Sequence, residues 1–193
     1  AMAIQPLICA FAAGNRAMIK MSENSNNLAL LLKRVSGNYF PLDKLAFFED
    51  GDGRGPSFTT LAFDHIFFTG SPNTGKAVMA NAAKNLTPVT LELGGKSPAI
   101  VAQDYSAKTA AERVMWAKML NAGQICTNVD YLMLPENKVE EFVSEAKALF
   151  NKRIPDINNG DYTSVIDQRS YDRLEETLAD AVAKGAKVVD LYS

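Results

Sequence analysis

Short apolar runs and helical patterns alternate along the chain. Apolar runs of four or five residues, bounded by glycine, proline or asparagine, are typical of buried strands. The segments between them space their apolar residues as one face of a helix does. We therefore expect strands over residues 16–20, 45–48, 65–69, 89–93, 97–102 and 131–134. We expect helices over residues 3–13, 27–35, 73–84, 107–120, 138–152 and 170–184.

This alternation of strand and helix with short connections predicts an α/β fold, in which helices cover a parallel sheet. Gly94 and Gly95 interrupt the pattern and mark the best candidate for a domain boundary. Residues 51–56 are expected to form a polar loop, and residues 187–191 a final strand. The apolar beginning and the strand-like end indicate that the 193 residues are a fragment of a longer chain.

Composition narrows the class of protein. Hydrophobic residues make up 47% and charged residues 22% of the chain, as in soluble globular proteins and unlike disordered or collagen-like chains. A net charge of −2 provides no basic surface for nucleic acid. No apolar run reaches the roughly 18 residues of a membrane span. Two distant cysteines and no signal-like start favour a reduced, cytoplasmic protein.

A turn at Gly70 and Ser71 follows the third expected strand. Ser71 is placed to cap the next helix, and Pro72 occupies its first position, where a missing N–H costs nothing. The free N–H groups and the positive dipole end of such a helix suit a phosphate group. The alternative is an ordinary capped helix, which any α/β protein contains.

A second cluster of polar residues, Lys20, Ser22 and Glu23, follows the first expected strand. In dinucleotide-binding folds, a carboxylate near the carboxyl end of a strand can hold ribose hydroxyls. A lysine at the same place can donate to that sugar. The alternative is a pair of solvated charges at the start of a helix.

Two further residues are candidates for catalysis. Glu92 ends an apolar strand, where a charge is costly unless it is paired or used, so it is a candidate general base. The alternative is a glutamate that reaches solvent or a lysine. Cys126 lies in a glycine-containing loop, where a thiolate is accessible as a nucleophile. The alternative is an inert buried thiol, which we expect of Cys9 because its neighbours are apolar.

The single histidine leaves little for metal chemistry. His65 precedes a strand and is expected to be structural. One histidine and two distant cysteines are too few for a zinc site, so no metal site is expected. A carboxylate is therefore the more plausible base for a reaction at Cys126, and Glu92 is the candidate.

Together these motifs resemble those of the aldehyde dehydrogenase superfamily, in the same order along the chain. The matching segments are Phe68–Ser71, Leu91–Pro98 and Gly123–Cys126. Lys20–Glu23 is similar to a family segment that ends in Lys-Pro-Ser-Glu, with Met21 in place of the proline. The resemblance implies a Rossmann-like parallel sheet, with residues 1–94 in the NAD(P)-binding domain and residues 95–193 in the catalytic domain.

The resemblance also implies a role for each candidate. Cys126 is the implied nucleophile, which forms a thiohemiacetal and then a thioester, and its backbone N–H is one oxyanion donor. Glu92, 34 residues earlier, is the implied base that activates water. The implied contacts to NAD or NADP are Lys20, Ser22, Glu23, Gly70, Ser71, Thr74, Leu93 and Gly94. Glu23 favours NAD, because a carboxylate repels a 2′-phosphate.

The segments Ile4–Leu7 and Cys126–Tyr131 are similar to those of the class that oxidises fatty and aromatic aldehydes, coniferyl aldehyde dehydrogenases included. We therefore expect a hydroxycinnamaldehyde as substrate. The implied walls of its tunnel, for which ordinary packing is the alternative, are Trp116, Leu120, Ile125 and Thr127.

The second oxyanion donor of the family and its nicotinamide-ribose contacts fall outside these residues. The 193-residue chain alone is therefore expected to be inactive, and its longer parent to be a homodimer or homotetramer. Two other classes stay open: a cofactor-independent cysteine acyltransferase or hydrolase, and a non-catalytic structural relative. Reduction of added cofactor in the presence of aldehyde distinguishes the first class from a dehydrogenase.

Overall fold

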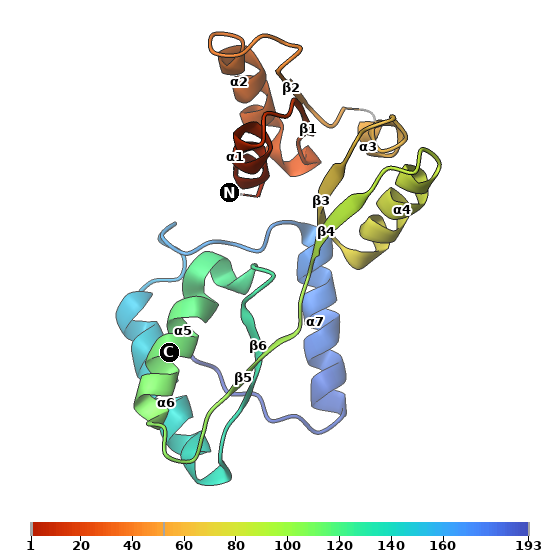
Figure 1. Cartoon of the computed structure of the whole chain (residues 1–193). Coiled ribbons are helices and arrows are strands. Elements are labelled where there is room, and N and C mark those ends of the chain that lie inside the picture. The colour runs from red at the N-terminus through yellow and green to blue at the C-terminus, as the bar shows by residue number, and fades with distance from the viewer. Residues whose placement is uncertain (1, 52, 193) are drawn as a thin grey trace. The chain divides into compact units, whose positions relative to one another are not determined.

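The structure is a computed structural model that describes residues 2–51 and 53–192 (Figure 1). The chain divides into two compact units, Ala1–Leu93 and Gly94–Ser193, and each unit is described by itself. The assignment of the two halves to a cofactor-binding and a catalytic domain stays a prediction.

Helices and strands alternate in both units, as predicted. The first unit contains α1 (Ile4–Ala12), β1 (Ala17–Lys20), the 3₁₀ helix η1 (Glu23–Ser25), α2 (Asn26–Ser36), β2 (Leu45–Phe48), α3 (Arg54–Phe58), β3 (Ile66–Gly70), α4 (Pro72–Ala83) and β4 (Val89–Leu93). The second unit contains β5 (Ser97–Ile100), α5 (Ala107–Met119), η2 (Leu120–Gly123), β6 (Val129–Met133), η3 (Glu136–Lys138), α6 (Val139–Arg153) and α7 (Gln168–Ala183).

The strands of the described residues pair two by two, and every pair is parallel. β1 pairs with β2, β3 with β4, and β5 with β6, and each pair is a separate two-stranded sheet. The helices α2, α4 and α5 connect the strands of the three pairs. Parallel pairing requires such a crossover. The chain is therefore built from three βαβ units, which confirms the α/β class and the parallel strands.

Between β4 and β5 the chain leaves one sheet and begins another. Only residues 94–96 separate these two strands, which is too short for the crossover that parallel neighbours need. β5 therefore begins a new sheet with β6. Its register shifts between Ser97 and Pro98, as is usual where a proline lacks the N–H of the ladder.

Three small apolar cores hold the elements together. In the first unit, Ala29 of α2 packs with Leu45 and Phe47 of β2. A second core joins Ile66 of β3 to Val78 and Ala82 of α4. In the second unit, Met115 of α5 packs against Ala146 and Phe150 of α6. The βαβ units are thus stabilised mainly by contacts between each helix and its own strands or the next helix.

Two predicted segments differ from the structure. In the expected polar loop at residues 51–56, Gly51 and Gly53 are outside any helix or strand, residue 52 lies outside the described residues, and residues 54–56 belong to α3. This helix begins at Arg54, after Gly53 in a left-handed conformation. The expected strand at residues 187–191 has no partner among the described residues and is not a strand. Instead, the Asn151 side chain donates a hydrogen bond of 2.7 Å to the Leu191 carbonyl. An apolar run becomes a strand only where a neighbouring strand pairs with it.

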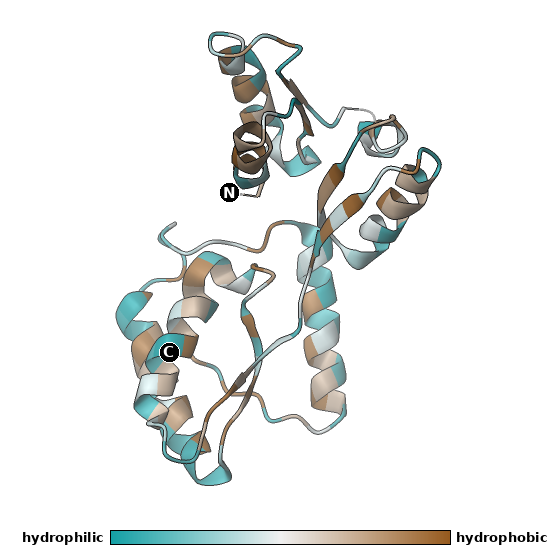
Figure 2. Ribbon diagram, in the orientation of Figure 1, coloured by the Kyte–Doolittle hydropathy of each residue, from teal (hydrophilic) through white to brown (hydrophobic). Residues whose placement is uncertain are grey.

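Helix α7 differs from the other long helices, because none of its residues is buried. Figure 1 draws it on the side of β5 and β6 opposite to α5 and α6, and Figure 2 shows its hydrophobic and polar bands. Within the described residues, no helix is both long enough and apolar enough to cross a membrane.

Candidate functional site

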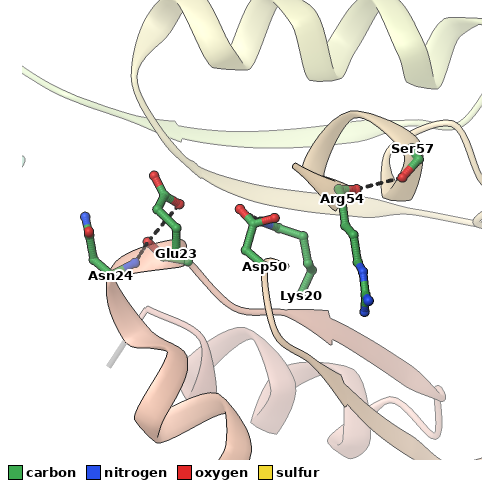
Figure 3. A network of polar contacts seen from close by, with 7 residues as sticks. Lys20, Glu23, Asn24, Asp50, Arg54 and Ser57 are labelled. Carbon is green, nitrogen blue, oxygen red and sulfur yellow. Dashed lines mark hydrogen bonds and ion pairs between the residues drawn. The ribbon is translucent and has the colours of Figure 1, made fainter. Parts of the chain in front are cut away.

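The first candidate site lies where β1 and β2 end. Because the strands are parallel, their carboxyl ends meet at one edge, with Lys20 opposite Phe48. The Lys20 Nζ atom lies 2.7 Å from Oδ2 of Asp50, which follows β2 by two residues. The two side chains are only 19% and 14% exposed. This ion pair is the polar centre of the edge (Figure 3).

Ser22 and Glu23 follow β1 along the chain, at the start of η1. The Ser22 Oγ accepts a hydrogen bond of 3.3 Å from the Asn24 backbone N–H and donates one of 3.3 Å to Glu23 Oε2. Glu23 is exposed and, with the next five residues, lines an open hollow of about 430 Å³. Figure 3 shows Asp50, not Glu23, lying over the Lys20 ammonium.

The Asp50 carboxylate has a vacant acceptor. Its Oδ1 atom is buried and has no hydrogen-bond partner in the part of the chain that the structure describes. Leaving a buried acceptor unpaired is costly, and a ribose hydroxyl is a suitable donor. A Cβ atom on Gly55 would lie 3.6 Å from Lys20 Nζ, so the glycine leaves space beside the ammonium. These features fit the adenosine ribose of a dinucleotide.

The second candidate site is the start of α4. Ser71 caps this helix: its Oγ accepts a hydrogen bond of 3.2 Å from the Thr74 backbone N–H and lies 2.9 Å from Thr74 Oγ1. Pro72 opens the helix. The predicted cap is therefore confirmed, and the two hydroxyls lie together at the end of the helix that favours anions.

The glycines around α4 have close neighbours. A Cβ atom on Gly70 would lie 2.5 Å from the Phe68 ring, and one on Gly75 would lie 2.9 Å from Leu93 Cδ2. Leu93 therefore packs its side chain against α4. A Cβ atom on Gly94 would meet nothing within 4 Å, and its backbone is exposed. The phosphate and nicotinamide roles of these residues stay predictions.

Glu92 lies in β4 opposite Thr69 of β3. Successive side chains of a strand point to opposite faces. Leu91 and Leu93 both approach Gly75 of α4, so Glu92 points to the other face and is exposed. The Glu92 carboxylate is therefore not buried by the described residues, and the free-energy cost of burying its charge does not arise. Glu92 belongs to the first unit and Cys126 to the second.

Cys126 lies on an exposed loop between η2 and β6. Just before it, Asn121, Ala122 and Gly123 adopt φ angles of 54°, 51° and 78°. This left-handed conformation costs roughly 1–2 kcal/mol for a residue with a Cβ atom. The turn therefore needs contacts from its surroundings to hold it.

Gln124 supplies several of those contacts. Its Nε2 donates hydrogen bonds to the carbonyls of Asn121, at 3.1 Å, and Ser164, at 3.0 Å. Its Oε1 accepts a 3.0 Å hydrogen bond from the Ile166 backbone N–H. The loop before Cys126 is thereby tied to the segment at residues 164–166.

Asn128 holds the other side of the loop. It is only 8% exposed, and its Nδ2 donates a hydrogen bond of 3.2 Å to the Ala117 carbonyl. Lys118 Nζ donates one of 2.8 Å to the carbonyl of Val129. Both contacts join the loop to the end of α5, so the backbone on either side of Cys126 is fixed.

Gly95 packs closely against the backbone of the Cys126 loop. A Cβ atom on Gly95 would lie 2.7 Å from the Cys126 carbonyl oxygen, a distance that Cβ atoms do not tolerate. The Cys126 backbone N–H donates to no acceptor within the described residues. The arrangement presents an accessible thiol with a free N–H beside it, as an oxyanion donor requires.

Cys9 corrects an expectation. It is exposed on α1 and is not the buried thiol that its apolar neighbours predict. Burial depends on which face of α1 meets other elements, and Leu7 and Phe11 occupy that face. Exposure alone therefore does not distinguish Cys126 from Cys9, whereas the fixed loop does.

Two of the four expected tunnel residues line an open pocket in the second unit. Trp116, Leu120, Met119, Arg153 and Ile154 surround about 210 Å³. Trp116 is 60% and Leu120 50% exposed, so neither is a core residue. Ile125 and Thr127 are exposed on the Cys126 loop and do not line this pocket.

His65 has the structural contact expected of it. Its Nε2 atom lies 2.9 Å from Thr90 Oγ1 on the neighbouring strand. Across residues 2–51 and 53–192, no group of three or more His, Cys, Asp or Glu side chains is arranged to hold a metal ion.

Sequence reasoning missed several residues that build these sites. Asp50 and Gln124 lie far along the chain from their partners Lys20 and Ser164, so no local spacing links them. A signal for Asp50 did exist: it lies two residues after a strand, Lys20 ends another strand, and the ends of parallel strands meet. Asn128 carries no such signal, because its burial depends on the packing of α5.

The fold and these motifs define a class of protein, and comparison with known families agrees. Residues 1–191 match the aldehyde dehydrogenase family. The chain belongs to the aldehyde dehydrogenase family.

Among curated proteins, the chain is similar to a probable coniferyl aldehyde dehydrogenase of Pseudomonas aeruginosa. The two are 48% identical over 193 residues, which is 100% of this chain and 40% of that protein. It is 44% identical over 191 residues to the coniferyl aldehyde dehydrogenase of a Pseudomonas species, covering 98% of this chain and 40% of that protein. The chain thus spans about 40% of the length of these relatives.

Solved structures agree with the fold. A substrate-bound AldH of Staphylococcus aureus matches with a TM-score of 0.85 and 36% identity, over 94% of this chain and 40% of that chain. An aldehyde dehydrogenase of Mycobacterium tuberculosis complexed with NAD+ matches with a TM-score of 0.83 and 28% identity, over 98% and 40% of the two chains.

Proposed function

We propose that these residues form part of an NAD(P)-dependent aldehyde dehydrogenase, which oxidises an aldehyde to a carboxylic acid. The observation that carries this proposal is the Cys126 loop. An exposed thiol with an unused backbone N–H is held by Gln124, Asn128 and Gly95, in a chain that belongs to the aldehyde dehydrogenase family.

Cys126 is the nucleophile of this proposal. Its Sγ adds to the carbonyl carbon of the aldehyde and forms a thiohemiacetal. The Cys126 backbone N–H donates a hydrogen bond to the carbonyl oxygen, where negative charge develops. Rigid placement of the loop raises the rate, because small displacements of a reacting group are costly.

Glu92 is the proposed base for the second half of the reaction. After oxidation, the acyl group is held on Cys126 as a thioester. The Glu92 carboxylate takes a proton from the water that attacks this thioester and releases the acid. Its exposed position at the end of β4 leaves the carboxylate accessible to water.

A nicotinamide cofactor, when bound, supplies the two-electron acceptor for this reaction. The proposed contacts to its adenosine ribose are Lys20, Ser22, Glu23 and Asp50. The residues at the start of α4 that suit its phosphates are Gly70, Ser71 and Thr74. Leu93 and Gly94 are the proposed backbone beside its nicotinamide.

A hydroxycinnamaldehyde is the proposed substrate class. Two relatives are named for coniferyl aldehyde, and the pocket between Trp116 and Ile154 is lined mainly by apolar side chains. An aromatic aldehyde suits such a surface. Because the reaction needs the free thiol of Cys126, we also infer a reducing compartment such as the cytoplasm. Assembly as a homodimer or homotetramer stays a prediction.

The experiment transplants residues 1–193 into the matching segment of the Pseudomonas coniferyl aldehyde dehydrogenase, to which they are 44% identical. We expect this chimera to reduce added NAD+ or NADP+ only when coniferyl aldehyde is present. Cys126→Ala abolishes the reduction, and the matched variant Cys9→Ala retains it. The 193-residue chain by itself is expected to be inactive.

Three results would contradict the proposal. A Cys126→Ala chimera with an unchanged oxidation rate would exclude Cys126 as the nucleophile. Ester hydrolysis without cofactor, together with no aldehyde-dependent reduction, would favour a cofactor-independent acyltransferase or hydrolase. A folded chimera with neither activity would favour a non-catalytic relative.

A further inference from the structure

The Lys20–Asp50 ion pair leaves one carboxylate oxygen unpaired within the described residues, a feature that the family match does not explain. The Asp50 carboxylate uses one oxygen for the lysine, at 2.7 Å, and leaves the other buried without a donor. It lies over the Lys20 ammonium at the edge where β1 and β2 end (Figure 3). A second carboxylate, Glu23, belongs to η1, three residues after Lys20.

We propose that Asp50 determines the cofactor specificity of this site. It accepts a hydrogen bond from the 2′-hydroxyl of the adenosine ribose and disfavours binding of a cofactor with a 2′-phosphate. This inference rests on the proposed function, because it requires that the strand ends hold that ribose. It assigns the choice between NAD and NADP to Asp50, with Glu23 in a supporting role.

The free acceptor of Asp50 distinguishes a hydroxyl from a phosphate. A 2′-hydroxyl is a hydrogen-bond donor and can satisfy the buried Asp50 Oδ1 atom. A phosphate group at the same place has only acceptor oxygens to offer when ionised. It would leave Oδ1 unpaired and would place like charges together, which is unfavourable at low exposure.

Two of the lysines near this edge are already paired. Lys20 is paired with Asp50. Lys33 Nζ lies 3.3 Å from Glu49 Oε2.

The titration of Glu49 agrees with this distribution of charge. A hydrogen bond from its own backbone N–H, and then the Lys33 ammonium, hold the pKa of Glu49 below its ordinary value, and the charge of Arg54 acts in the same direction. The Lys33 ammonium thus stabilises the Glu49 carboxylate. A 2′-phosphate would have to separate Lys20 from Asp50 to pair with Lys20.

The experiment compares two ligands that differ only at the 2′ position. ¹H–¹⁵N NMR titrations of the 193-residue chain with AMP and with adenosine 2′,5′-bisphosphate give a Kd for each ligand. We expect AMP to shift the resonances of residues 17–28 and 45–51. We expect the bisphosphate to bind at least tenfold more weakly than AMP.

Asp50→Asn removes the charge and releases Lys20, so it should reduce the ratio of the two Kd values at least fivefold. Glu49→Gln is the matched control, because it removes the same charge one residue earlier. Its ratio should stay within twofold of the unsubstituted chain. A role of Asp50 in stability alone would not alter this ratio.

The outcomes separate this inference from the proposed function. If AMP shifts no resonance at the strand ends, the proposed cofactor site is wrong and this inference is wrong with it. If AMP binds there but the Asp50→Asn ratio is unchanged, only this inference is overturned. Equal Kd values for the two ligands in the unsubstituted chain also overturn it, and that comparison needs no folded variant.

Discussion

Gly95 and Cys126 are in direct backbone contact, although 31 residues separate them along the chain. A Cβ atom on Gly95 would lie 2.7 Å from the Cys126 carbonyl oxygen. The contact joins the segment that follows β4 to the loop that carries the thiol. It gives a physical reason for a glycine at position 95 that does not involve a ligand.

Gly95→Ala is therefore expected to displace the Cys126 loop. Overpacking of this kind destabilises a protein by about 1–3 kcal/mol. Urea denaturation measures the change in the free energy of unfolding, and the rate of Cys126 alkylation by iodoacetamide reports the altered loop. Gly94→Ala is the control, because its Cβ atom would meet nothing within 4 Å. Equal stability losses in the two variants would show that the contact is unimportant.

Glu92→Gln is expected to stop the reaction after the acyl group has been transferred to Cys126. The amide cannot take a proton from the attacking water, so the thioester accumulates. Intact-mass measurement of the chimera after addition of coniferyl aldehyde and cofactor should show an added acyl mass. Normal turnover with no adduct would mean that another group is the base.

Ser71→Ala removes the cap of α4. The Thr74 backbone N–H loses its 3.2 Å partner, so we expect a loss of about 1 kcal/mol in the free energy of unfolding. Ser71→Thr keeps a hydroxyl acceptor and should lose less. The measurement is urea denaturation of the 193-residue chain. An unchanged unfolding midpoint in Ser71→Ala would mean that the cap contributes nothing.

Asp167 should make the start of α7 sensitive to acid. Hydrogen bonds from the Ser170 side chain and backbone lower the pKa of Asp167 below 3.8. A lowered folded-state pKa gives stability that is present above the unfolded value and is lost as the pH falls through the folded value. We therefore expect amide exchange in the first turn of α7 to accelerate below about pH 4, where protonation of Asp167 begins.

The matched variant for this prediction is Asp167→Asn, which can cap the helix without titrating. Its exchange rate, corrected for the intrinsic pH dependence, should stay level over the same range. Hydrogen exchange at the Ser170 amide, read by NMR, makes the measurement local to the cap. The same acid response in both proteins would exclude Asp167 as its source.

Local signals were reliable where a residue's neighbours in sequence are also its neighbours in space. The cap at Ser71 and Pro72 needs only the first turn of α4, and the structure confirms it. Gly14, at φ 79°, lies two residues after the last residue of α1, where a left-handed residue closes a helix within a few positions. The glycine-rich segment at residues 51–56 predicted only a loop, and this missed α3, which begins directly after Gly53.

Whether a side chain is buried could not be predicted from its neighbours in the sequence. The apolar surroundings of Cys9 in sequence predicted a buried thiol, but α1 turns that side chain outward. For Glu92 the sequence left two alternatives open, a charge in use or a charge that reaches solvent, and the strand places it exposed on the face away from α4. Both cases have one cause: the face that an element buries depends on the elements packed against it.

Most strands and helices, the cap of α4, and the motifs that resemble an aldehyde dehydrogenase were determined by the amino-acid sequence itself. Each depends on contacts over a few residues. The tertiary structure alone decided that Asp50 meets Lys20, that Gln124 reaches Ser164, and that Gly95 touches Cys126. Those contacts join residues 30 or more positions apart. Chain geometry and packing bring them together, and no local pattern of polar and apolar residues encodes that.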